Sequence, residues 1–168
     1  MSTGKTELLL CIISLLSFQA CVREDLPASG NFALKEGDPL PTFSIANQHE
    51  TVSINDLKDK SALIIFFSTT CRDCQQAFPD IAALYKEYKD NLSVRVLLIA
   101  RDETEEQASA YFRKHDFDME FFPDPERKVY SLFADNTIPR VFLADQTGKI
   151  ILTQTEKVDA GEIRAKVY

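Results

Sequence analysis

Several features that define whole classes of proteins are scarce or missing in this sequence. It has only two histidines, His49 and His115, so a structural zinc site with four protein ligands has too few candidates. Its net charge of −7 leaves no basic patch to neutralise the phosphates of a nucleic acid. The apolar run at residues 8–16 is shorter than the about 20 residues that a membrane-spanning helix needs. We therefore expect no metal site, no nucleic-acid partner and no membrane-spanning helix.

The chain has the length and composition of one domain with a short additional segment. It contains 168 residues, of which 45% are apolar and 27% are charged, as in a soluble globular core. No internal repeat or low-complexity tract is visible. We expect a monomer.

The N-terminal segment resembles the signal of an exported lipoprotein. Lys5 precedes the apolar run, which has the length of the apolar part of a secretory signal. Ala20 then stands directly before Cys21, as in a bacterial lipobox, in which the cysteine is lipidated and becomes the mature N-terminus. The alternative is an ordinary cleaved signal with an unmodified Cys21. The sequence thus predicts a lipoprotein signal peptide at residues 1–20.

The segment that follows predicts a tether between a membrane and a folded domain. Residues 21–36 are polar, contain glycine and proline, and show no periodicity, as in a flexible linker. A lipid on Cys21 would place the domain, residues 37–168, on a membrane surface. We expect the periplasmic face or the outer membrane, with exposure at the cell surface as a further option.

Strands are expected in two hairpins and three other segments. Turns at Asn47–Glu50 and Asp145–Gly148 each separate two apolar segments and predict hairpins. A continuous apolar run at Ala62–Phe67 predicts a strand buried on both faces, and Val94–Ala100 predicts a second buried strand. A short strand is expected at Phe121–Phe122.

Helices are expected between these strands. Apolar residues recur at helical spacing from Cys71 onward, and a short helix is expected around Val129–Phe133. Acidic pairs at Asp102–Glu105 and Asp159–Glu162 predict capping boxes that open two further helices. Because strands and helices alternate, the fold class is α/β, a central mixed sheet flanked by helices with an N-terminal β-hairpin extension.

Two cysteines stand at the predicted start of the helix that follows the first buried strand. Cys11 would leave with the signal and Cys21 would carry lipid, so only Cys71 and Cys74 remain in the domain. The N–H groups at a helix N-terminus stabilise a thiolate, and the first thiol of a Cys-X-X-Cys site commonly has a lowered pKa. A Cys71 thiolate could attack a disulfide, and Cys74, one helical turn on, could resolve the mixed disulfide.

The cysteine pair has two other interpretations. It could bind copper(I) through its thiolates, although redox pairs also do so adventitiously. It could be a structural disulfide, but such a short loop removes little entropy from the unfolded chain. A redox couple is the interpretation that we prefer.

From residue 37 onward the chain resembles the TlpA/ResA-type branch of the thioredoxin-like family, within the redoxin and AhpC/TSA superfamily. The segments that carry the resemblance are GDPLPTFSIANQHETVSINDLKDKSALIIFFSTTCRDC, PDIAALYKEYKD and TIPRVFLADQTGKII. The resemblance implies a thioredoxin-like fold and an exported thiol–disulfide oxidoreductase without a cofactor. Its partners would be protein thiols and disulfides and an upstream thiol donor. It also implies that Cys71 attacks, that Cys74 resolves to give a Cys71–Cys74 disulfide, and that Pro139 is a cis-proline facing them.

Four residues near these positions are expected to tune the site. Thr70 stands where relatives carry an aromatic residue, Asp73 where they carry proline, and Arg140 where threonine often follows the cis-proline. Arg72 and Asp73 bring opposite charges that roughly cancel. These differences leave the couple intact but affect its potential, rate and substrate.

Relatives also carry an acidic residue that this chain lacks. Apolar Ile65 and Ala77 occupy the positions six residues before and six after Cys71 where an acid is found in family members. We therefore expect Cys74 to lose its proton to water or hydroxide. The alternative is that Asp73, or one of the acids at 102 and 103, has taken over this task.

Two other functions compete with disulfide exchange. A peroxiredoxin-type thiol peroxidase needs a proline seven residues and a threonine three residues before the attacking cysteine, where this chain has Ile64 and Ser68. A redox-inert thioredoxin-fold binding module would need neither the cysteine pair nor the Ile-Pro sequence before an apolar strand.

Overall fold

The structure, a computed structural model, describes residues 32–167, so the predicted signal peptide and Cys21 lie outside the described residues. Its centre is a five-stranded sheet with the strand order β5-β4-β3-β6-β7. β3 is parallel to β4, β4 is parallel to β5, and β6 and β7 complete the sheet with antiparallel pairings. The strands are β3 Ser61–Phe67, β4 Val94–Arg101, β5 Phe122–Asp124, β6 Arg140–Ala144 and β7 Ile150–Thr155. The predicted mixed sheet is confirmed.

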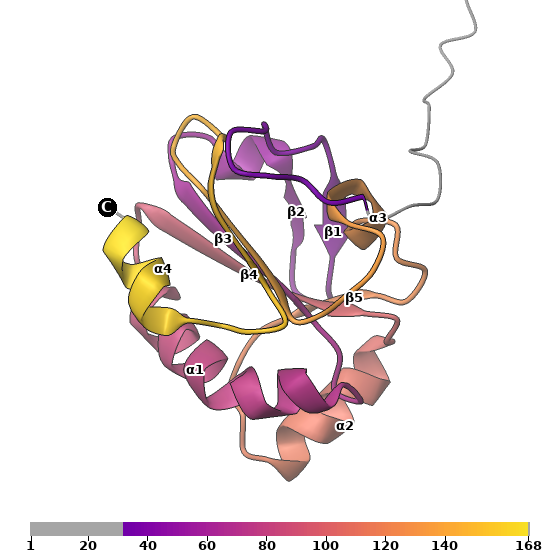
Figure 1. Cartoon of the computed structure of the whole chain (residues 1–168). Helices are drawn as coiled ribbons and strands as arrows, with labels where there is room; N and C mark the ends of the chain where they lie inside the picture. The colour runs from indigo at the N-terminus through magenta and orange to yellow at the C-terminus, as the bar shows by residue number, and fades with distance from the viewer. Residues whose placement is uncertain (1–31, 168) are drawn as a thin grey trace, which may run out of the picture.

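Helices cover both faces of this sheet. The helices are α1 Arg72–Tyr88, α2 Glu105–Lys114, α3 Tyr130–Phe133 and α4 Ala160–Lys166. Figure 1 shows α1, α2 and α4 on one side, and α3 with the N-terminal strands on the other. No helix within residues 32–167 is long and apolar enough to cross a membrane.

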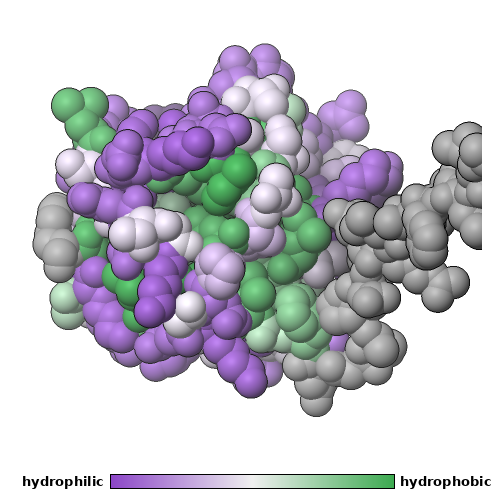
Figure 2. Space-filling view, turned by 90° about the horizontal axis from the view of Figure 1, so that it is seen from above, coloured by the Kyte–Doolittle hydropathy of each residue, from purple (hydrophilic) through white to green (hydrophobic). Residues whose placement is uncertain are grey.

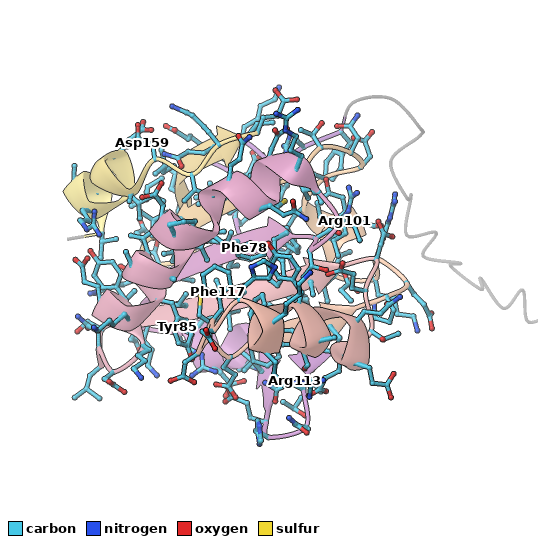
Figure 3. All side chains as sticks on the ribbon, turned by 90° about the horizontal axis from the view of Figure 1, so that it is seen from below. Phe78, Tyr85, Arg101, Arg113, Phe117 and Asp159 are labelled. Atoms are coloured by element: carbon cyan, nitrogen blue, oxygen red, sulfur yellow. The ribbon has the colours of Figure 1, made fainter. Side chains whose placement is uncertain are left out.

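The central strand β3 is buried along its whole length because both of its faces are covered. Successive side chains of a strand point to opposite faces. Phe66 accordingly packs on Tyr130 of α3, with ring centroids 5.1 Å apart. Its neighbour Phe67 packs on Phe78 of α1 and Phe112 of α2, at 5.4 and 5.6 Å. Figure 3 shows Phe78 between α1 and α2. The aromatic core therefore fixes α1 against the end of β3.

The predicted N-terminal hairpin forms a small sheet of its own. It consists of β1 Ser44–Ala46 and β2 Thr51–Ser53, which pair antiparallel and lead into the short 3-10 helix η1 Ile54–Leu57. The Asn47 side chain closes the turn by accepting hydrogen bonds from the backbone N–H groups of residues 49 and 50. Seen from above, the molecule presents apolar residues within a largely hydrophilic surface (Figure 2).

The predicted capping box at the start of α2 is wrong. α2 begins after Thr104, whose side chain accepts a hydrogen bond from the Gln107 backbone while the Gln107 side chain accepts from the Thr104 backbone. Asp102 has a φ of 65°, in the left-handed region, and its carboxylate binds Arg127. It therefore belongs to the loop, and the helix starts two residues later than predicted.

At α4 the predicted cap is right and its reciprocal half is wrong. The Asp159 carboxylate accepts a hydrogen bond from the Glu162 backbone at 3.0 Å. The side chain of Gln154 in β7, however, takes the place of the reverse contact. Its amide donates to the Glu162 carboxylate at 2.7 Å, and its carbonyl accepts from the Asp159 backbone at 2.8 Å.

Contacts with the domain are already present before residue 37, the predicted boundary between tether and domain. Phe32 and Asp135 exchange hydrogen bonds of 2.9 and 3.1 Å, and the Leu34 backbone donates to the carbonyl of Phe133 at 2.9 Å. Residues 32–34, assigned to the flexible tether by their composition, thus lie against the end of α3. Composition alone could not show this backbone pairing.

Candidate active site

The cysteine pair lies where β3 ends and α1 begins. The turn Ser68–Thr70 joins the two elements, and Cys71 is the residue that caps α1. Its sulfur accepts a hydrogen bond from the Cys74 backbone N–H at 3.5 Å. Cys71 is partly exposed, whereas Cys74 is fully buried beneath the first turn of the helix. The predicted placement of a thiol at a helix N-terminus is therefore what the geometry shows.

The loop before β6 lies beside the cysteine pair. The Cys71 thiol, which is free, points at the carbonyl oxygen of Ile138 with a separation of 3.6 Å. The Ile138–Pro139 peptide bond is cis. The structure thus brings together Cys71, Cys74 and the residue preceding Pro139, although 67 positions separate Cys71 from Ile138 in the sequence. Within residues 32–167, no group of three or more His, Cys, Asp or Glu side chains is arranged to hold a metal ion.

Burial changes the acidity of the Cys74 thiol. It raises the pKa of the Cys74 thiol far above the usual range of cysteine, so this thiol is protonated at neutral pH. The Ser68 backbone amide and, more weakly, the charge of Arg101 act in the opposite direction and lower the pKa. Any reaction of Cys74 therefore needs a way to stabilise its thiolate.

The four residues predicted to tune the site occupy different environments. Arg72 and Asp73 are exposed in the first turn of α1. The Thr70 hydroxyl is 2.8 Å from that of Ser68. Arg140 is buried in β6, opposite Phe66 of β3.

A buried carboxylate, Glu103, supports the turn before the cysteines. It is 4% exposed and lies in the loop after β4. It accepts hydrogen bonds from the Thr69 backbone at 3.0 Å, the Thr69 hydroxyl at 2.6 Å and the Ser68 hydroxyl at 3.1 Å. The sequence pointed to Glu103 only as one of several acids. One sequence feature could have identified Glu103: it follows β4, which is parallel to β3. The carboxyl ends of neighbouring parallel strands lie at the same edge of a sheet, so Glu103 is placed near the turn that follows β3.

Tyr130, which sequence reasoning did not select, supports the loop before the cis-proline. Its hydroxyl is hydrogen-bonded to the carbonyl oxygens of Asn136 and Thr137. The Arg101 guanidinium lies over its ring, 4.9 Å from the centroid. The Tyr130 phenol, which contacts the Arg101 guanidinium, thus holds the loop that precedes the cis-proline.

An open hollow of about 490 Å³ lies beside the cysteine that is exposed. Cys71 and Ile138 form one part of its wall, and Arg101, Glu103 and Gln107 form another. Its size and position allow a group bonded to the Cys71 sulfur to lie against polar side chains.

The parallel β3-α1-β4 unit, the Cys-X-X-Cys pair at the start of α1 and the cis-proline opposite define a thioredoxin-like protein. More narrowly, the chain belongs to the AhpC/TSA family, whose sequence model matches residues 36–153. The predicted family resemblance and the predicted fold class are confirmed.

Curated relatives support this assignment. The chain is 28% identical over 152 residues to the Bacillus cereus protein named thiol-disulfide oxidoreductase ResA, covering 88% of this chain and 87% of the relative. It is 29% identical over 119 residues to the thioredoxin-like protein YneN of Bacillus subtilis, covering 70% and 69%.

Solved structures show the same fold. The thioredoxin domain of a thiol-disulfide oxidoreductase from Bacteroides vulgatus superposes with a TM-score of 0.67 at 20% identity, covering 81% of this chain and 100% of that one. StoA from Bacillus subtilis superposes with a TM-score of 0.61 at 20% identity, covering 75% and 96%.

Proposed function

We propose that this protein is an exported thiol–disulfide oxidoreductase that exchanges disulfides with protein substrates through Cys71 and Cys74. The observation that carries the proposal is the asymmetry of the pair. Cys71 is partly exposed at a helix N-terminus beside an open hollow, and Cys74 is buried one turn behind it. Such a pair can attack an external disulfide and then close on itself.

The exchange proceeds in two steps that conserve electrons and protons. The Cys71 thiolate attacks one sulfur of the substrate disulfide, so that a Cys71–substrate bond forms and the substrate's S–S bond breaks with release of a thiolate. Cys74 then loses its proton, and its thiolate attacks the Cys71 sulfur. A Cys71–Cys74 disulfide forms, the second substrate thiolate leaves, and two electrons have passed to the substrate. An upstream thiol donor reverses these steps on the protein.

The proposal includes the location that the N-terminal sequence predicts. Lipidation of Cys21 after removal of residues 1–20 would anchor the domain to a membrane outside the cytoplasm. The proposed activity is supported by the curated relatives, which are named thiol-disulfide oxidoreductase ResA. A monomer is sufficient, because every residue of the proposed site comes from one chain.

One contact disfavours the peroxidase alternative. Ser68 stands where that alternative needs a threonine hydroxyl near the attacking sulfur. In this structure the Ser68 hydroxyl is bonded to Glu103 and lies 2.8 Å from the Thr70 hydroxyl. A peroxidase would therefore lack the hydroxyl that it requires at this position.

Reduction of insulin disulfides with dithiothreitol as electron donor tests the proposal. We expect the wild type to accelerate precipitation of the insulin B chain and Cys71→Ser to be inactive. Cys74→Ser should accumulate a mixed disulfide with insulin that mass spectrometry detects and that excess dithiothreitol dissolves. Equal activity of wild type and Cys71→Ser would overturn the proposal, and rapid hydrogen peroxide consumption without insulin reduction would favour the peroxidase.

A further inference from the structure

The turn between β3 and α1 touches both cysteines. The Ser68 carbonyl accepts a hydrogen bond from the Cys71 backbone at 3.3 Å. The Ser68 backbone amide lowers the pKa of the Cys74 thiol. One peptide segment therefore acts on both the attacking and the resolving cysteine.

Glu103 is the main polar anchor of this turn. Its carboxylate accepts from the backbone and the hydroxyl of Thr69 and from the hydroxyl of Ser68. Ser68 and Thr69 are only 5% and 6% exposed, so water cannot readily replace these bonds. A second hydrogen bond to the turn comes from α1, where the Gln75 side-chain amide donates to the Thr69 carbonyl at 2.7 Å.

The other acids near the cysteines make no such contact. Asp73 is exposed on α1, and Asp102 is bound to Arg127 and lies 3.1 Å from Arg101. Glu103 is thus the acid that the fold couples to the cysteine turn.

We propose that Glu103 is a positioning residue of this site: it holds the Ser68–Thr69 turn in place against the start of α1, where both cysteines lie, and thereby speeds resolution of the mixed disulfide. This inference rests on the proposed function. In relatives, an acid at position 65 or 77 would take the proton of the resolving thiol directly. In this protein, an amide donor that a carboxylate keeps in place would assist the resolving thiol instead.

The two thiols should depend on Glu103 to different degrees. The Cys71 sulfur is supported by the Cys74 backbone and faces the Ile138 carbonyl, and neither contact involves Glu103. For Cys74, the Ser68 amide is the leading influence that opposes the effect of burial. Loss of the carboxylate should therefore slow the second step of exchange and leave the first step nearly unchanged.

The reaction of the reduced full-length protein with 5,5′-dithiobis(2-nitrobenzoate) separates these steps. Attack by Cys71 releases one thionitrobenzoate, at a rate that depends on reagent concentration. Attack by Cys74 on the Cys71 sulfur releases the second, at a rate that does not. The protein dithiol becomes a disulfide, and one reagent molecule is reduced to two thiolates. Stopped-flow absorbance at 412 nm records both phases.

Glu103→Gln removes the charge and keeps the shape of the side chain. We expect its first phase to stay within about twofold of wild type, since the Cys74 backbone N–H that donates to the Cys71 sulfur does not contact Glu103. Its second phase should fall about tenfold at pH 7, and the pH–rate curve of that phase should move up by about one unit. Glu106→Gln makes the same chemical change at an exposed position of α2 and should match wild type in both phases.

Thr69→Val provides a second test if Glu103→Gln folds poorly. It removes only the hydroxyl bond to Glu103 and should slow the second phase by an intermediate factor. Circular dichroism melting confirms that each variant is folded. An unchanged second phase in both variants, or an equal fall of both phases, would overturn the positioning role. A wild type that releases only one thionitrobenzoate would overturn the proposed function as well.

Discussion

Cys71 and Cys74 are three residues apart in the sequence but lie in different environments. Cys71 is partly exposed, and Cys74 has no exposed surface. Burial also raises the pKa of the Cys74 thiol, which keeps it in the unreactive protonated form.

Alkylation should therefore distinguish the two thiols. With iodoacetamide at pH 7 we expect the reduced Cys74→Ser variant, which retains Cys71, to react at least about tenfold faster than Cys71→Ser. In urea, where neither thiol is buried, the rates should converge, which provides the control. Similar rates for the two folded variants would contradict the assigned roles.

The individual residues of the candidate site differ in how far the sequence could reveal them. The cysteine pair and the Ile-Pro sequence are local motifs, and both were found. Glu103 acts on Thr69 across 34 positions, so its role depends on which strands are neighbours. Arg140 was selected as a departure from the family, but nothing local indicated that its side chain would be buried.

The loops that surround the site join elements that are distant in the chain. Asp102, in the loop between β4 and α2, is hydrogen-bonded to Arg127, in the loop between β5 and α3. The Arg127 guanidinium lowers the pKa of the Asp102 carboxyl. The pair thus links two loops at the same edge of the sheet.

The contribution of this pair should depend on pH. The unfolded carboxyl has a pKa of about 3.9, and the folded value is lower. The pair therefore stabilises the fold above about pH 4, and this stabilisation is lost as the pH falls through the folded pKa.

Asp102→Asn tests this linkage. Asparagine tolerates the left-handed backbone at this position, so the change acts mainly on the charge. Because the Asp102 side chain is 37% exposed, we expect a loss of only about 0.2–1 kcal/mol in the free energy of unfolding at pH 7. Urea unfolding followed by circular dichroism should show this loss at pH 7 and almost none near pH 2. The exposed control Asp90→Asn should show no comparable change between the two values. An equal loss for Asp102→Asn at both pH values would contradict the argument.

The elements themselves were largely predictable, whereas their ends were not. The runs that became β3 and β4 are mostly apolar because helices cover both faces of the sheet, and this pattern is visible in the sequence. The start of α2 was misplaced because two residues, Asp102 and Thr104, can each cap a helix. The choice between them depends on Arg127, which the local pattern does not include.

The molecule as a whole combines a redox domain with an N-terminal segment that predicts attachment to a membrane. The contacts of residues 32–34 with the end of α3 shorten the predicted tether to residues 22–31. Even fully extended, ten residues reach at most about 36 Å. A lipid on Cys21 would therefore keep the cysteine pair close to the membrane surface, where it would meet substrates that are themselves anchored or newly exported.

In this proposal the anchor is Cys21 alone, because the apolar run at residues 8–16 is too short to span a bilayer. We expect Cys21→Ser, expressed as the full chain in a bacterial host, to move from the membrane fraction to the supernatant after a carbonate wash. Cys11→Ser changes the other N-terminal cysteine and should remain in the membrane fraction, since Cys11 would leave with the signal peptide. Mass spectrometry of the wild type should show a lipid-modified residue 21 at the N-terminus. If Cys21→Ser is processed and still resists the wash, the anchor is not a lipid on this cysteine.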